Sequence, residues 1–190
     1  MVQAQGLVPD SVEFQENRQY SQWLGIRLEN ASGCNAVSFE VDLPSGISTG
    51  TVETPIDPLH QWDMSDRKFM CYSTDNTPLE DESSFIGFSL TDLAGLYSGT
   101  VNGYLRNVEI STKECTLLRL PDIPFSITFP EAIPGDTNLD GRVNDTDKIK
   151  IVDYLLGKDP LYFNEANADL NADGEVTVSD LVIIISLLNS

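Results

Sequence analysis

Residues 135–147, GDTNLDGRVNDTD, are repeated 33 positions later as residues 168–180, ADLNADGEVTVSD. Counted from the first aspartate, both copies carry acidic or amide side chains at alternate positions and a glycine at position 6. This spacing is typical of an EF-hand-type loop, in which the chain curls around a Ca²⁺ ion. Two copies of one pattern in a short region argue against chance, so the sequence predicts two calcium loops.

The loop offers oxygen ligands to calcium, a hard cation, at positions 1, 3, 5, 7, 9 and 12. Position 7 contributes only its main-chain carbonyl, which explains why either Arg142 or Glu175 can occupy it. Position 12 lies on the incoming helix, whose N-terminus favours a negative charge. The alternative is a pair of metal-free turns, rich in aspartate and asparagine, that cap two helices. The predicted ligands are Asp136, Asn138, Asp140, Arg142, Asn144 and Asp147 for the first ion, and Asp169, Asn171, Asp173, Glu175, Thr177 and Asp180 for the second.

An amphipathic helix is predicted after each loop, because apolar residues recur there at helical spacing. These residues are Ile149, Val152, Leu155 and Leu156 after the first loop, and Leu181, Ile184, Ile185 and Leu188 after the second. Pro130 and Pro134 stiffen the connection before the first loop, and Pro134 and the strand-like stretch ahead of it leave no room for a preceding helix. We therefore expect the order loop–helix, connector, loop–helix, and two domains at residues 1–134 and 135–190.

The N-terminal domain is predicted to be an all-β sandwich, because apolar and polar residues alternate along most of residues 10–130. Leu24, Ile26 and Leu28 share one face of a strand, and Val37, Phe39, Val41 and Leu43 share one face of the next. Further strands are predicted at residues 68–73, 83–90, 103–111, 115–120 and 125–129. The stretch IDPLHQWDMSDRKF, residues 56–69, is interpreted as a loop, and TDLAGLYSG, residues 91–99, as one short turn at most.

The chain is acidic in both domains, with a formal net charge of −19 over 190 residues. Nucleic-acid binding needs clustered lysine and arginine, so a nucleic-acid partner is not expected. No apolar run is long enough for a membrane span. No leader opens the sequence, and we expect Met1 to stand where a signal peptide was removed from a secreted or cell-surface protein. The three cysteines, Cys34, Cys71 and Cys115, leave one disulfide or free thiols equally open.

No set of catalytic residues emerges from the sequence. His60 is the single histidine and is interpreted as structural or exposed, and the acidic run at residues 80–82 is interpreted as a solvated turn. Aromatic side chains can stack on sugars, but those of the first domain are scattered along the chain, and most are expected in the core. We therefore expect a protein that is not an enzyme. The aromatic residues considered are Tyr20, Trp23, Trp62, Tyr72, Tyr97 and Tyr104.

The duplicated motif, with aspartate at position 12 and a helix behind it, resembles type I dockerin domains over residues 135–190. The resemblance implies a small all-α domain that binds two Ca²⁺ ions and a cohesin module on another protein. In that family, loop positions 10 and 11 contact cohesin, which implies partner-binding roles for Asp145, Thr146, Val178 and Ser179. Thr146 and Ser179 match the hydroxyl residues common there. Basic residues common later on the family's helix are replaced by Asp153 and Ser186, so the two copies present different faces.

The stretch GIRLENASGCNAVSFEVDLPSGIS, residues 25–48, is similar to the opening strands of cohesins and of related carbohydrate-binding sandwiches. This similarity implies a cohesin-like sandwich of the jelly-roll type. The expected function is non-catalytic and extracellular: the dockerin attaches the sandwich to a cohesin-type module in a polysaccharide-degrading, cellulosome-like or cell-surface system. The alternative is a carbohydrate-binding or adhesion module, with a polysaccharide as ligand, that its dockerin anchors. An enzyme fragment tagged by a dockerin is a third hypothesis.

The predicted helix at residues 181–188 is apolar on almost all sides, which a small domain cannot bury alone. We expect part of this surface to dock on the chain's own β-sandwich or on a second molecule.

Overall fold

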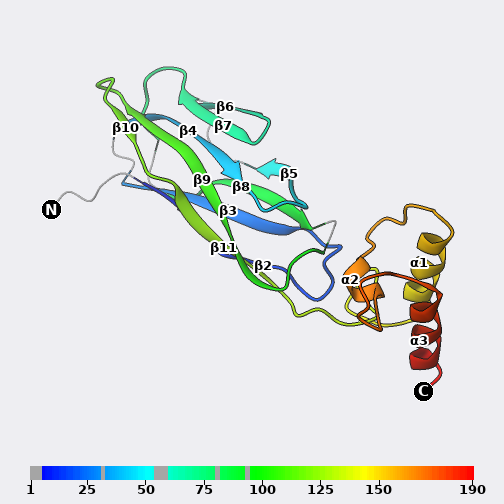
Figure 1. Ribbon diagram of the computed structural model, residues 1–190. Helices are drawn as coiled ribbons and strands as arrows, with labels where there is room; N and C mark the ends of the chain where they lie inside the picture. Colours follow the sequence, from blue (N-terminus) through cyan, green and yellow to red (C-terminus); the bar gives the residue numbers. More distant parts are fainter. Residues whose placement is uncertain (1–5, 31–32, 54–59, 80–81, 93–94) are drawn as a thin grey trace.

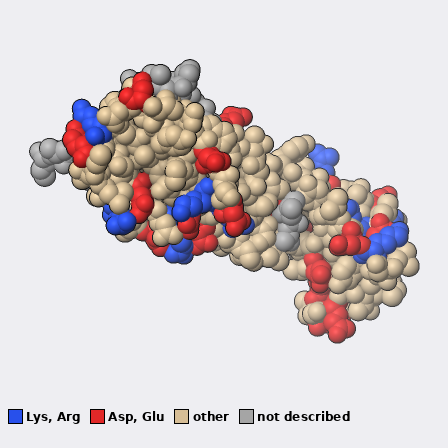
Figure 2. All heavy atoms as spheres, turned by 90° about the horizontal axis from the view of Figure 1, so that it is seen from above, with Lys and Arg blue, Asp and Glu red and all other residues tan. Residues whose placement is uncertain are grey.

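Two sheets and a group of short helices make up the computed structural model, which describes residues 6–30, 33–53, 60–79, 82–92 and 95–190. The sheets form one lobe, and the helices form a smaller lobe at one end of it (Figure 1). In the view of Figure 2, acidic and basic side chains intermingle on the larger lobe, whereas the surface between the lobes is mostly uncharged. The chain crosses between the lobes at residues 130–134.

The described strands form a sandwich of two sheets, in which the spatial order of the strands differs from their order in the sequence. One sheet has the order β1-β3-β8-β5, and the other has the order β2-β11-β9-β4-β7-β6 with β10 paired to β9. The strands are β1 (Gly6–Pro9), β2 (Val12–Glu13), β3 (Gln22–Glu29), β4 (Cys34–Asp42), β5 (Ile47–Glu53), β6 (His60–Ser65), β7 (Lys68–Ser73), β8 (Glu82–Asp92), β9 (Gly99–Thr112), β10 (Leu117–Arg119) and β11 (Ile123–Phe129). Nearly all pairs are antiparallel, the exception being β2 with β11.

The core of the sandwich follows from the alternation along its strands, since successive side chains of a strand point to opposite faces. The apolar sets predicted on β3 and β4 are buried, as expected. Three fully buried rings meet at the centre: Phe39 lies 5.1 Å from Phe69 and 6.3 Å from Phe88, measured between centroids. Cys34 and Cys71 are also buried, whereas Cys115 is exposed in the turn between β9 and β10.

The interpretation of residues 56–69 as a loop is wrong for its described part, which contains strand β6. The hairpin partners are His60 with Ser73 and Ser65 with Lys68, and the turn between them places Asp66 and Arg67 at positive φ. Two residues at positive φ suit the short turns that join antiparallel strands. The strand was missed because it lies at the edge of its sheet and exposes most of its side chains, which weakens the alternation.

The smaller lobe contains three helices, α1 (Asp145–Leu155), α2 (Glu165–Ala168) and α3 (Val178–Leu188). Helices α1 and α3 are the two predicted from apolar spacing, and they pack against each other through Ile151 and Ile184, which are both fully buried. Helix α2 was not predicted, because one turn of helix carries no periodic signal. It occupies the connector between the two repeats and contributes Ala168 to the same small core. None of the described helices is long and apolar enough to cross a membrane.

Candidate calcium loops and partner surface

The first repeat folds as a tight loop around its own aspartates. The carboxylate of Asp136, at position 1, accepts hydrogen bonds from the main-chain N–H groups of Asp140 at 3.0 Å and Gly141 at 2.9 Å. Gly141 has φ of +82°, a conformation that glycine adopts without steric cost. Asn138 accepts from the same Asp140 N–H at 3.0 Å, and the Asp140 carboxylate accepts from the Arg142 N–H at 3.0 Å. Positions 1, 3 and 5 therefore turn toward the inside of the loop.

Position 12 closes the loop onto helix α1. One carboxylate oxygen of Asp147 accepts from the N–H groups of Thr137 at 2.9 Å and Asn138 at 3.1 Å, and the other accepts from Asn144 at 2.8 Å. Asn144 is the N-cap of α1, and its side chain accepts from the Thr146 N–H at 2.8 Å. The aspartate thus ties both ends of the loop to the first turn of the helix. Its acidic charge also complements the positive end of the helix dipole.

The second repeat builds the same network. The Asp169 carboxylate accepts from the N–H groups of Asp173 at 3.1 Å and Gly174 at 2.8 Å. Asp180 accepts from Leu170 at 2.9 Å, from Asn171 at 3.2 Å and from Thr177, the N-cap of α3, at 2.8 Å. The distances to the aspartates at positions 1 and 12 agree within about 0.1 Å between the two loops. The structure therefore brings together the side chains at positions 1, 3, 5 and 12 of both repeats, whereas the Asn144 side chain at position 9 caps α1, and Arg142 and Glu175 at position 7 are exposed.

The two loops differ in their surroundings. Asp136 and Asn138 are each 3% exposed, whereas Asn171 and Asp173 in the second loop are exposed. Burial raises the pKa of Asp136, an effect that hydrogen bonds from Gly141 and Asp140 only partly offset and that the nearby charges of Asp147 and Asp140 reinforce. The first loop therefore gathers carboxylates that repel one another.

The position-12 aspartates differ in the same way. Burial raises the pKa of Asp147. Burial also acts to raise the pKa of Asp180, but hydrogen bonds from Thr177, Asn171 and Leu170 outweigh it, and the resulting pKa is lowered. Both carboxylates are out of contact with solvent. The difference arises because the sandwich surrounds the first loop with additional protein, which increases the cost of charge there.

The donor set of each loop fits a calcium ion in kind. It combines carboxylates, an amide oxygen and a main-chain carbonyl, which are the oxygen ligands that calcium prefers. A divalent cation would relieve the repulsion among the buried acids of the first loop. Within the described residues, no group of three or more His, Cys, Asp and Glu side chains has metal-binding geometry. The predicted ligand set differs from such a group, because asparagine side chains and carbonyls supply part of it.

The residues predicted to bind a partner lie on the surface, at the start of the two helices. Asp145, Thr146, Val178 and Ser179 are all exposed, and the side chain of Asp145 contacts Lys148. Positions 10 and 11 precede the buried position-12 aspartate, so they begin each helix on its outer side. The structure thus presents all four residues to solvent.

Helix α3 keeps an exposed apolar surface, as the sequence indicated, but this surface does not lie on the sandwich. Val178, Val182, Ile185 and Leu187 are 40–65% exposed. Figure 1 places α2 on the side that faces the sandwich, with α1 and α3 farther away. The hypothesis that the apolar surface of this helix docks on the chain's own sandwich is therefore wrong in this structure. Docking on a second molecule is the alternative that remains.

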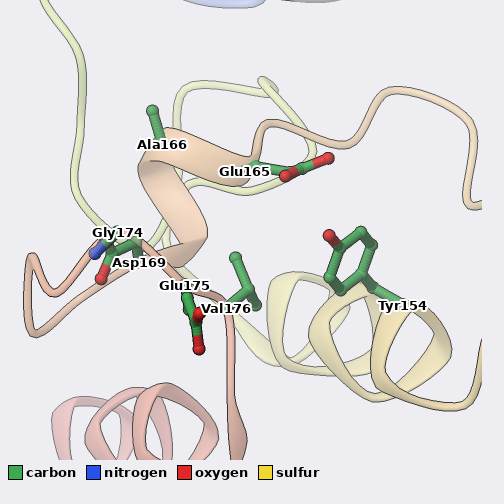
Figure 3. Close-up of a pocket in the computed structure, with 7 residues that line it drawn as sticks. All are labelled: Tyr154, Glu165, Ala166, Asp169, Gly174, Glu175 and Val176. Carbon is green, nitrogen blue, oxygen red and sulfur yellow. Dashed lines mark hydrogen bonds between the residues drawn. The ribbon is translucent and has the colours of Figure 1, made fainter.

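A pocket of about 540 Å³ lies between α1, α2 and the second loop (Figure 3). In that view the Tyr154 ring and the Glu165 carboxylate point toward each other. The charge of Glu165 raises the pKa of Tyr154, and the Tyr154 ring stacks on Phe163 with centroids 4.6 Å apart. These contacts tie α1 to the connector. Loop residues Asp169 and Gly174 form another wall of the pocket.

The residues considered for catalysis or sugar binding do not form one site in the described structure. His60 is 8% exposed, and its Nε2 atom lies 3.1 Å from the Thr77 carbonyl oxygen, so this residue is buried rather than exposed. Glu80 and Asp81 lie outside the described residues. The expectation that most aromatics belong to the core is wrong for Tyr20, Trp23, Trp62 and Tyr72, which are at least 40% exposed. Trp23 lies on one sheet, whereas Trp62 and Tyr72 lie on the other.

Residues 134–189 match the family model described as "Dockerin type I domain". A comparison with curated proteins found no match. The match covers both loops, α1, α2 and α3, and it agrees with the resemblance seen in the repeated motif.

The sandwich resembles solved cohesin structures. A non-cellulosomal cohesin from the hyperthermophilic archaeon Archaeoglobus fulgidus has a TM-score of 0.52 at 11% identity, covering 68% of this chain and 93% of that one. A cohesin module from a Clostridium perfringens family 33 glycoside hydrolase has a TM-score of 0.52 at 10% identity, with coverages of 67% and 97%. The third ScaB cohesin of R. flavefaciens, solved in complex with a group 1 dockerin, has a TM-score of 0.53 at 11% identity, with coverages of 69% and 99%. At such identities the likeness establishes the fold alone. The chain therefore joins a sandwich with the cohesin fold to a C-terminal type I dockerin region.

Proposed function

We propose that this chain is a non-catalytic assembly protein, whose calcium-loaded dockerin attaches its sandwich to a cohesin-type module of another protein. The observation that carries the proposal is the duplicated loop network, which recurs position by position and coincides with the dockerin match. We place the protein outside the cell, in a polysaccharide-degrading or cell-surface system, because cohesin–dockerin systems work there.

Two Ca²⁺ ions are proposed as the cofactor, one in each loop. Side chains at positions 1, 3, 5, 9 and 12 and the carbonyl at position 7 would hold each ion. Binding would couple to folding, because the same aspartates that ligate the ion also tie the loop to its helix. The small core of the domain is a weak source of stability on its own, so the ions are expected to contribute much of it.

The partner is proposed to contact the outer side of α1 and α3, beginning at Thr146 and Ser179. The two copies of this surface are not equivalent: the first includes a charged pair between Asp145 and Lys148, whereas the second begins with the exposed apolar residue Val178 and continues to Val182. A partner with an apolar contact patch would favour the α3 copy. This asymmetry predicts one preferred orientation of the bound partner.

A binding experiment on the full chain tests the proposal. Calcium uptake is measured by calorimetry, and binding to a panel of cohesin modules is measured by biolayer interferometry with calcium and with EDTA. We expect two calcium sites and calcium-dependent binding to at least one cohesin. Ser179→Asp should weaken that binding about tenfold or more, since it would bury a charge, whereas Thr116→Asp on an exposed turn of the sandwich should not. Calcium uptake without binding to any cohesin would refute the assembly role.

A further inference from the structure

The first calcium loop is in direct contact with the sandwich through residues 16–19, which we name the bridging segment. The main-chain N–H of Arg18 donates to the Leu139 carbonyl at 2.9 Å. The side-chain amide of Gln19 donates to the Asn138 carbonyl at 2.9 Å. The two acceptors are the main-chain carbonyls at loop positions 3 and 4. Neither carbonyl is a predicted calcium ligand, because position 3 is predicted to contribute its side chain and position 4 is not a ligand position. The sandwich therefore forms hydrogen bonds to the loop without occupying any atom that is predicted to bind calcium.

Side-chain packing reinforces this contact. Leu139 is 3% exposed, and a Cβ atom added to Gly95 of the sandwich would lie only 2.5 Å from a Leu139 methyl carbon. A Cβ added to Gly141 would lie 3.0 Å from the Cβ of Glu16, in the bridging segment. The two lobes are thus so close that Gly95 has no room for a side chain and Gly141 has little.

Helix α2 provides a second attachment. Asn164, its N-cap, donates from its side chain to the Gly95 carbonyl at 2.6 Å, and its N–H donates to the Thr137 carbonyl at 2.9 Å. Asn167 donates from its side chain to the Asp136 carbonyl at 2.8 Å. The connector between the repeats therefore holds the first loop and the sandwich at the same time.

Arg18 anchors the bridging segment inside the sandwich. Its guanidinium, 4% exposed, donates to the carbonyls of Tyr97 at 2.7 Å and Pro130 at 2.8 Å, and it lies 3.5 Å from the buried carboxylate of Asp92. Pro130 begins the connection between the lobes. One side chain thus fixes the end of the sandwich and the start of that connection, while its own main chain holds Leu139.

The second loop is an internal control for this arrangement. It has the same hydrogen-bond network, but Ala172 stands at the position of Leu139, and residues 171–175 are exposed. A Cβ added to Gly174 would meet nothing within 4 Å. The contacts with the sandwich therefore belong to the first loop and are not a general property of the fold.

We infer that the first loop, when it holds calcium, is a joint that locks the dockerin onto its own sandwich, whereas the second loop serves the helices alone. The inference rests on the proposed calcium function. The carbonyls that accept from the bridging segment lie between the proposed ligands at positions 1, 3 and 5. An unliganded loop that opens would misplace them, and by linkage the sandwich contacts would in turn strengthen calcium binding at this loop.

The test uses ¹⁵N relaxation of the full chain, which reports the rotational correlation time of each lobe. With calcium, both lobes of the wild type should give one common value. Asp136→Ala should shorten the correlation time of residues 135–190 roughly twofold, as expected for a small domain that moves separately. The matched variant Asp169→Ala, in the second loop, should keep the common value. Leu139→Ala, which copies Ala172 and removes no proposed ligand, should release the dockerin while calorimetry still finds two calcium ions.

The outcomes separate this inference from the proposed function. Separate tumbling of calcium-loaded wild-type lobes, or equal effects of Asp136→Ala and Asp169→Ala, would overturn the joint while leaving calcium binding intact. The absence of any calcium uptake would overturn both. If Asp136→Ala loses its helices by circular dichroism, Leu139→Ala decides: a common correlation time in that variant refutes the joint.

Discussion

Replacing Arg18 by methionine should destabilise the sandwich strongly, because the substitution leaves Asp92 charged and buried. Asp92 is 1% exposed, and Arg18 is the cation that faces it at 3.5 Å. Removing one partner of a buried ion pair costs about 3–5 kcal/mol. The carbonyls of Tyr97 and Pro130 also lose their donor, which places the expected loss toward the upper part of that range.

Urea unfolding can measure this loss for the sandwich alone. Both tryptophans, Trp23 and Trp62, belong to it, so tryptophan fluorescence does not report on the helical lobe. With a slope of about 2 kcal/mol per molar urea, the midpoint should fall by roughly 1.5–2.5 M. Arg119→Met is the matched control, because that side chain is 73% exposed and pairs with Glu109 at the surface; its midpoint should change little.

The double variant Arg18→Met with Asp92→Asn shows whether the loss of stability comes from the unpaired charge of Asp92 or from the lost packing of Arg18. Asparagine removes the charge while keeping an oxygen that can accept from the Gly95 N–H, as Asp92 does at 2.9 Å. The double variant should therefore be more stable than Arg18→Met alone. A midpoint shift below about 0.5 M for the single variant, or no recovery in the double variant, would refute the reasoning.

Three further predictions concern the helical lobe. EDTA should abolish the helical circular dichroism of the chain while leaving tryptophan fluorescence unchanged, and helices that survive chelation would contradict calcium-coupled folding. As the pH is lowered from 7, calcium should dissociate from the first loop at a higher pH than from the second, which calorimetry can follow. The reason is that burial raises the pKa of Asp147, so protons compete with the ion there at a higher pH. Hydrogen bonds lower the pKa of Asp180, so the second loop should keep its ion to a lower pH. Gly174→Ala should lower the thermal stability of the helices by about 1–2 kcal/mol through its positive φ, and Gly141→Ala should cost more because it also meets Glu16; equal costs would contradict the contact.

The repeated motif made the loops and the two main helices predictable, because loop chemistry is local in sequence. The side chains at positions 1, 3, 5 and 12 converge as their spacing indicated. Strands with a clear inner and outer face, such as β3 and β4, were predictable for the same reason. Edge strand β6 was not, since most of its side chains are exposed and its sequence carries little alternation.

The contact between the lobes could not be predicted from local patterns, because its partners are far apart in the chain. Arg18 and Leu139 are separated by 121 positions, and Gly95 and Asn164 by 69. One signal was present in the repeat itself: position 4 is Leu139 in one copy and Ala172 in the other. A large apolar residue in an acidic loop indicates a buried neighbour, but the sequence does not say which segment supplies it.

The fixed connection between the lobes has a consequence for any complex that the dockerin enters. Domains in series are typically joined by flexible linkers, and the length of the linker sets how far each domain can move relative to the next. Here Arg18 donates to the carbonyl of Pro130, so the linker is fixed at its first residue. A partner that binds α3 would receive the sandwich pointing in one direction. The angular freedom of such a complex would then have to come from the partner's own linkers.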